Sequence, residues 1–74
     1  MKAKELLGKE VSDVNAKKIG KVADIDLDMQ RGVIDYFVVK AGLTKKYHVT
    51  SHEIDKIGDE IILKISEDEL RKKA

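Results

Sequence analysis

The 74-residue sequence contains no cysteine, which excludes disulfides and thiolate metal ligands and leaves the hydrophobic core without covalent support. Its longest uninterrupted apolar run, Tyr36 to Val39, is far shorter than the ~20 residues that cross a bilayer as a helix. The amino terminus also lacks the apolar region of a signal peptide. We therefore expect a cytoplasmic protein with no transmembrane segment, associated with membranes at most through a partner.

An excess of positive charge is lacking too, because 15 lysines and arginines face 14 aspartates and glutamates, for a formal net charge of +1. Nucleic-acid-binding domains concentrate cations on one surface and often interleave them with aromatic side chains. Here aromatic residues make up only 4% of the chain. None of them alternates with the clustered lysines, which we interpret as a solvated face, so we do not expect nucleic acid as a partner. These lysines are Lys17, Lys18, Lys21, Lys45 and Lys46.

Hydrophobic residues make up 42% of the chain and charged residues 39%, a balance typical of a folded domain rather than a disordered segment. A chain of this length buries only about 60% of the surface that it exposes when unfolded, so the core is small. We predict a single domain over residues 1–74, with a strand barrel over about residues 8–65 and a short helix over about residues 66–73.

Six short segments carry strand signals and are separated by tight turns. No helical pattern long enough for a parallel crossover lies between them, so the sequence predicts an all-β fold, a small six-stranded antiparallel barrel. Within the second segment, Ile19 and Val22 share a face only if the strand slips by one residue, which predicts a bulge near Gly20. The six segments are Glu10–Val14, Lys18–Met29, Val33–Lys40, Lys46–Thr50, Glu53–Ile57 and Glu60–Ile65.

Two short helical segments flank the strands. Residues Lys2 to Gly8 are predicted to form a helical turn before the first strand. After the last strand, Ser66 and Glu69 have the spacing of a capping box and predict a short helix. Leu70 is the only large apolar residue of that helix, so the sequence leaves open whether it packs on its own barrel or on a partner.

Three stretches that together span nearly the whole chain resemble the PRC-barrel family: LLGKEVSDVNAKKIGKVADIDLD, GVIDYFVV and HVTSHEIDKIGDEIIL. Two positions depart from the family pattern, since Ala16 stands where members often have glycine in the first turn and Thr50 where many have proline. The resemblance implies a six-stranded barrel that has no enzymatic activity of its own and binds other proteins.

Three aspartates at alternate positions, Asp24, Asp26 and Asp28, are spaced like the start of a calcium-binding loop. Such a loop needs glycine at its sixth position and glutamate at its twelfth, where this sequence has Met29 and Asp35. We therefore interpret the stretch as a strand with its carboxylates outward, and keep the three aspartates only as weak candidates for cation binding. The apolar residues expected to face inward are Ile25, Leu27 and Met29.

No constellation in the sequence indicates catalysis. His48 and His52 lack the further ligands of a zinc site, and we interpret them as histidines beside a turn. The serines have no nucleophile-elbow context. We therefore expect no enzyme, no cofactor and no small-molecule substrate.

The stretch from Val33 to Val39 is apolar in both phases of a strand, apart from Asp35. Strands of this kind are usually covered on both faces, whereas a barrel has one interior. If Asp35 marks the outer face of the strand, the apolar residues in phase with it lie outside the barrel. Either other segments of this chain or another chain must then cover them. The interface candidates are Val33, Phe37, Val39, Ile62 and Leu70.

The family supplies concrete versions of a binding role. PRC-barrel domains occur in the cytoplasmic part of the photosynthetic reaction-centre H subunit and in the ribosome maturation factor RimM, where the domain contacts a ribosomal protein. Stand-alone archaeal members of this length include cell-division adaptors that bind SepF. We expect a homodimeric, non-catalytic adaptor of this archaeal kind. The alternatives are a ribosome- or RNA-associated factor like RimM and a weak cation-binding module.

Overall fold

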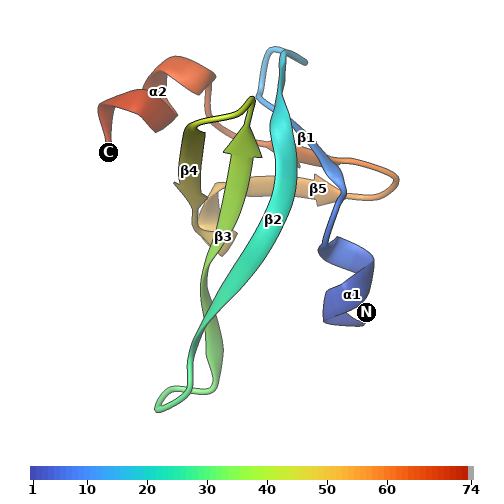
Figure 1. Cartoon of the computed structure of the whole chain (residues 1–74), viewed down its shortest axis with the longest axis vertical. Coiled ribbons are helices and arrows are strands. Elements are labelled where there is room, and N and C mark those ends of the chain that lie inside the picture. The colour runs from blue at the N-terminus through green and yellow to red at the C-terminus, as the bar shows by residue number, and fades with distance from the viewer. Residues whose placement is uncertain (74) are drawn as a thin grey trace.

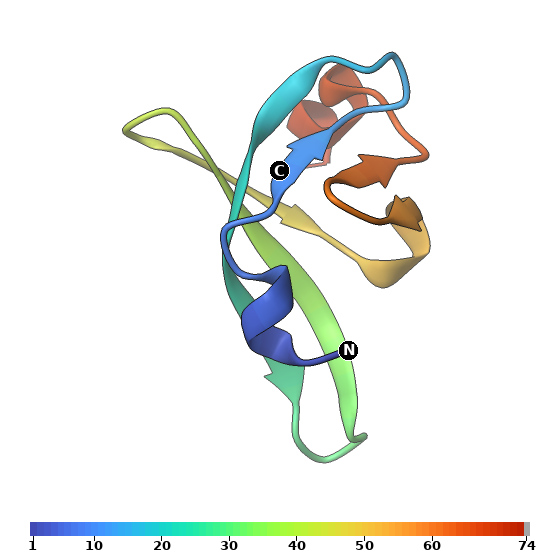
Figure 2. The ribbon, with the colours of Figure 1, turned by 90° about the vertical axis from the view of Figure 1, so that its right-hand side faces the viewer.

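The computed structural model describes residues 1–73, whose strands form one six-stranded sheet in the order β4-β3-β2-β1-β6-β5. The sheet curls into a half-barrel, with a short helix at each end of the chain (Figure 2). The predicted strand number, barrel architecture and C-terminal helix are confirmed. The elements are α1 (Ala3–Leu6), β1 (Glu10–Ser12), β2 (Lys18–Asp28), β3 (Val33–Ala41), β4 (Lys45–Val49), η1 (Ser51–Glu53), β5 (Ile54–Ile57), β6 (Ile61–Leu63) and α2 (Glu67–Lys72).

One strand pair is parallel, so the prediction of a purely antiparallel barrel is wrong. β1 runs parallel to β6, with Val11 beside Ile61, whereas the other neighbouring strands are antiparallel. The cause is the connection between β4 and β5, which lie at opposite ends of the sheet and are joined by the 3₁₀ turn η1 rather than by a hairpin. Because this corner removes one reversal of direction, β6 returns alongside β1 in the same sense.

Register shifts decide which side chains of β2 and β3 face the core. The slip predicted near Gly20 is present, and it leaves Ile19 and Val22 both buried, 7% and 2% exposed. Two further shifts lie between β2 and β3, where Ala23 and Asp35 each have no partner in the register. Each extra residue reverses the facing of the side chains that follow it.

The bulge at Asp35 corrects the predicted exposure of two interface candidates. Phe37 and Val39 were expected to share an outer phase with Asp35, but they are 4% and 1% exposed and lie in the core. Because Asp35 is the extra residue of the bulge, the face to which it points does not indicate the face to which Phe37 and Val39 point. The half-buried Tyr36 and Val38 occupy the alternate positions instead.

The C-terminal helix packs on its own barrel. Leu70 of α2 is 2% exposed and belongs to the main hydrophobic cluster, which answers the question that the sequence left open. The Tyr47 hydroxyl on β4 donates a hydrogen bond to Glu67 at 3.4 Å, and Ser66 caps the helix as predicted. The core therefore joins the sheet to both helices. It consists of Leu6, Val11, Ile19, Val22, Phe37, Val39, Tyr47, Val49, Ile61, Leu63 and Leu70.

Candidate functional site

β2 and β3 continue past the rest of the barrel as a two-stranded projection, which we call the arm and define as residues 27–34 (Figure 1). Four apolar side chains on it are exposed: Leu27 (54%), Met29 (81%), Val33 (43%) and Ile34 (37%). They line one hollow of about 230 Å³ together with Asp28 and Gly32. The expected inward facing of Leu27 and Met29 is wrong, because the arm extends beyond the core, whereas Ile25 packs against it.

The three aspartates of β2 do not act together. The Asp28 carboxylate accepts hydrogen bonds from the backbone N–H groups of Gln30 and Arg31, both at 3.1 Å, and so orders the turn of the arm. Asp24 accepts from the neighbouring backbone N–H of Ile25 at 2.8 Å. Over residues 1–73, no three carboxylate or imidazole side chains are grouped closely enough to hold a metal ion.

The remaining aspartate, Asp26, lies opposite Tyr36 in the register of β2 and β3. A hydrogen bond to its carboxylate raises the pKa of the Tyr36 hydroxyl. The Tyr36 ring in turn stacks on His48 of β4, with centroids 4.3 Å apart and planes 20° from parallel. These three side chains form a continuous polar and aromatic group across the outer side of the sheet.

Beside this group, lysines meet across three strands. Lys40 of β3 is opposite Lys21 of β2 on one side and opposite Lys46 of β4 on the other. Like charges directly opposite one another destabilise a sheet. Among the described residues, none of these three lysines has a carboxylate within 4.0 Å of its ammonium group. The ion pairs of the described residues involve other lysines and arginines. We call Lys21, Lys40 and Lys46 the lysine row.

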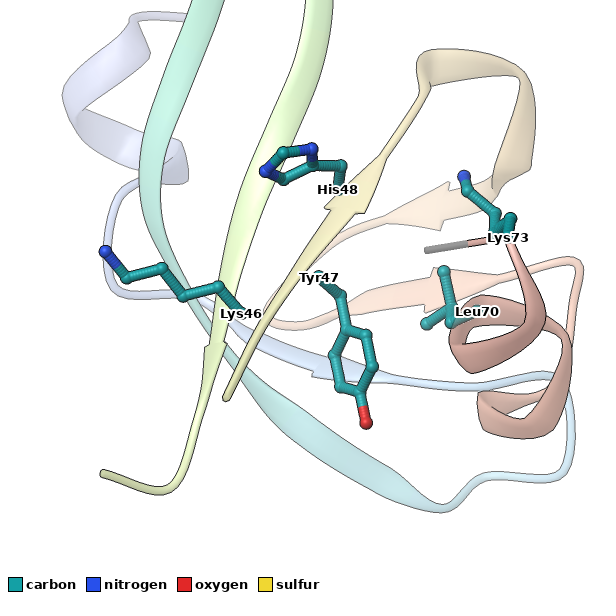
Figure 3. A pocket seen from close by; sticks show the side chains of 5 residues that line it. All are labelled: Lys46, Tyr47, His48, Leu70 and Lys73. Carbon is teal, nitrogen blue, oxygen red and sulfur yellow. The ribbon is translucent and has the colours of Figure 1, made fainter. Parts of the chain in front are cut away.

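A groove of about 360 Å³ lies between β4 and α2 (Figure 3). Lys46 and His48 project to one side of β4, whereas Tyr47 projects to the other, toward the helix that carries Leu70. Lys73 lines the far wall, and its ammonium group is held by Glu53 at 2.5 Å. Tyr47 and Leu70 therefore give the groove an apolar surface on the side of β4 that faces the helix.

The architecture and the sequence features identify the family. A model of the PRC-barrel domain matches residues 1–70. The chain belongs to the PRC-barrel family. This domain is a small protein-interaction fold, and the family is non-catalytic. No curated protein matches the chain.

In this PRC barrel the expected interface candidates are scattered. Val33 is exposed on the arm and Ile62 is half-buried on β6, whereas Phe37, Val39 and Leu70 lie in the core. His48 is exposed on β4 and His52 is exposed on η1. Within residues 1–73, no helix combines the length and the apolar character that a membrane crossing requires.

Sequence reasoning missed the lysine row and the ring stack of this PRC barrel because both are made across strands. Lys21 is distant in the chain from Lys40 and Lys46, and the three are brought into one row only by the register of β2, β3 and β4. Tyr36 and His48 were each assigned to strands, yet nothing in the sequence states which residues of two strands lie together. The positions of the two bulges between β2 and β3 would have given the register. The hydrophobic pattern indicates these positions only after the core residues are known.

Proposed function

We propose that this PRC-barrel protein is a non-catalytic adaptor that self-associates through its arm and presents a second surface to another protein. The observation that carries this proposal is the exposed apolar cluster of Leu27, Met29, Val33 and Ile34 at the end of a projection of the fold. Contiguous apolar surface of this kind marks interaction sites, whereas single exposed apolar residues are ordinary.

The charges around the cluster favour a second copy as its occupant. Asp28 and Arg31 lie 4.0 Å apart beside the apolar residues, so the arm presents both signs of charge. In a two-fold dimer the same patch meets itself, and a rim with both signs lets the carboxylate of one copy approach the guanidinium of the other. The cluster is small, so the expected dimer is weak and exchanges rapidly.

Sedimentation equilibrium over a concentration series tests the self-association. We expect the wild type to dimerise and Met29→Asp and Val33→Asp to shift the equilibrium to monomer, because each places a charge in the apolar contact. Leu43→Asp is the matched control, since Leu43 is 94% exposed in the turn after β3, outside the cluster. A wild type that stays monomeric at its highest soluble concentration, or a Leu43→Asp variant that dissociates equally, contradicts the proposal.

The family resemblance supports one named partner for the adaptor, the division protein SepF. Affinity capture with the wild type and with Met29→Asp, followed by mass spectrometry, separates this version from the ribosome-associated alternative. Recovery of SepF supports the division role. Recovery of ribosomal proteins instead replaces it by a role like that of RimM.

A further inference from the structure

The strand β4 ends the sheet with unused backbone groups. Among residues 1–73 its backbone pairs with β3 alone, and no other backbone hydrogen bond involves Lys45–Val49. In an antiparallel pair, alternate residues direct their N–H and C=O groups away from the partner strand. An exposed row of such groups is a template for a further strand.

We propose that the edge of β4 binds an extended segment of a different protein in which carboxylate and apolar side chains alternate. This inference deepens the proposed adaptor role and rests on it for the class of partner, but it concerns a surface separate from the arm. The segment adds as a seventh strand, with its carboxylates beside Lys46 at the β4 end of the lysine row and its apolar side chains in the groove.

The alternation follows from the two sides of β4. Side chains of a strand point alternately to opposite faces, and those on one face repeat every ~6.6 Å. On one face of β4 lie Lys46 and His48, and on the other Tyr47 lies in the groove wall (Figure 3). A strand paired with β4 places its side chains alternately on these two faces. Acidic side chains suit the face of Lys46, and apolar side chains suit the face of Tyr47.

The charge of the edge selects an acidic occupant. Lys45, Lys46 and the adjacent Lys40 have no carboxylate within 4.0 Å in the described part of the chain. A segment with carboxylates therefore neutralises charges that the fold itself leaves opposed across β3 and β4. A second β4 brings the same lysines against these, so the edge also disfavours a copy of this chain.

Nucleic acid fits this surface less well than an acidic peptide. On the outer side of the sheet, Asp24 and Asp26 follow Lys21 along β2 and repel a phosphate backbone. The facing sides of the Tyr36 and His48 rings already stack on each other, so no base can insert between them.

The test uses a labelled synthetic peptide of alternating glutamate and valine that matches the five residues of β4 in length. We expect NMR shifts and slowed hydrogen exchange at the amides of Lys45–Val49. Replacing glutamate by lysine in the peptide should abolish binding. Methylating alternate peptide nitrogens keeps the charge but removes strand pairing, and should also abolish binding.

Variants of the chain complete the test. Lys40→Glu with Lys46→Glu should weaken binding of the peptide by at least about tenfold, because the side chain beside the added strand and the one a strand behind it both become negatively charged. Lys4→Glu with Lys2→Glu, which changes the charge equally at α1, should leave the affinity unchanged. Met29→Asp should also leave it unchanged, so a failure at the arm and a failure at β4 are distinguishable.

Three outcomes of the peptide experiments overturn the inference. They are undetectable binding at millimolar peptide, equal binding of the methylated peptide, and shifts confined to residues outside β4. Tighter binding of a single-stranded oligouridylate with the same dependence on Lys40 and Lys46 overturns it as well, because the surface is then a site for nucleic acid.

Discussion

The carboxylate of Asp13 accepts a hydrogen bond from the backbone N–H of Glu67 at 3.0 Å and so joins two residues 54 positions apart in the chain. Its other oxygen accepts from the N–H groups of Asn15 and Lys17, each at 2.9 Å. Burial raises the pKa of Asp13, but these three N–H groups outweigh it, so the pKa lies below its usual value. One buried carboxylate, 2% exposed, therefore fastens α2 to the turn between β1 and β2.

Replacing this carboxylate should loosen the helix and destabilise the barrel. We expect Asp13→Ala to lower the free energy of unfolding by about 2 kcal/mol or more, because buried N–H groups lose their acceptor. Urea unfolding measures the change, and hydrogen exchange at the amide of Glu67 shows whether α2 detaches first. Asp68→Ala is the control, since the Asp68 side chain is 79% exposed. Equal unfolding midpoints for the two variants would contradict the anchoring role.

Much of the fold could be predicted because strand signals are local. Alternating apolar residues and turn chemistry gave six strands close to their observed bounds, and the capping box of Ser66 and Glu69 gave the last helix. The parallel pairing of β1 with β6 could not be predicted, because it depends on the corner at η1. The burial of Phe37 could not be predicted either. Side chains of a strand alternate between two faces, and the extra residue Asp35 reverses the face of every side chain that follows it.

The candidate surfaces were predicted least well. Val33 on the arm was a candidate from the sequence and is exposed, but Leu27 and Met29 were expected to face the core. The expectation failed because periodicity indicates which residues share a face and does not indicate where the core ends. The arm leaves the barrel while its hydrophobic pattern continues.

The first hairpin turn stores strain at Ala16. Ala16, which stands where family members often have glycine, adopts the left-handed conformation in this turn, with a φ of 65°. A side chain with a Cβ in this region costs roughly 1 kcal/mol, and glycine avoids the cost. We expect Ala16→Gly to raise the unfolding free energy by about 0.5 kcal/mol, after the greater freedom of glycine in the unfolded chain is subtracted.

Thermal unfolding followed by circular dichroism tests this gain, which corresponds to a rise of a few degrees. Ala3→Gly in α1 is the control, because Ala3 has no positive φ to relieve and should lose stability. A lower melting temperature for Ala16→Gly would show that the turn is not strained.

Gly20 permits the close approach of β2 to β3. A Cβ at this position would lie 2.1 Å from the carbonyl oxygen of Lys40, which is backbone and cannot swing aside. We expect Gly20→Ala to cost about 2–3 kcal/mol in unfolding free energy, because the two strands must separate locally. Gly58→Ala is the matched control, since a Cβ there meets nothing within 4 Å. Chemical denaturation of both variants should therefore give well-separated midpoints.

The ion pairs of α2 should make the protein sensitive to acid. A hydrogen bond from Lys17, at 2.8 Å, and a second from Arg71 lower the pKa of Glu67, and the pKa of Asp13 is lowered as well. A carboxylate whose pKa is lower in the folded state contributes stability above its unfolded pKa, about 4, and loses it as the pH falls through the folded value. We therefore expect the urea midpoint to fall steadily below about pH 4.5.

The ion pair between Lys17 and Glu67 also determines how stability changes at high pH. The hydrogen bond to Glu67 raises the pKa of Lys17. The stability that Lys17 contributes is therefore complete below the unfolded lysine pKa, about 10.4, and is lost only above it. Between these limits the two groups add no pH dependence. Glu67→Gln should flatten part of the acid decline, whereas Glu5→Gln in α1 should not. An acid decline of equal depth in Glu67→Gln and the wild type would mean that other carboxylates carry the effect.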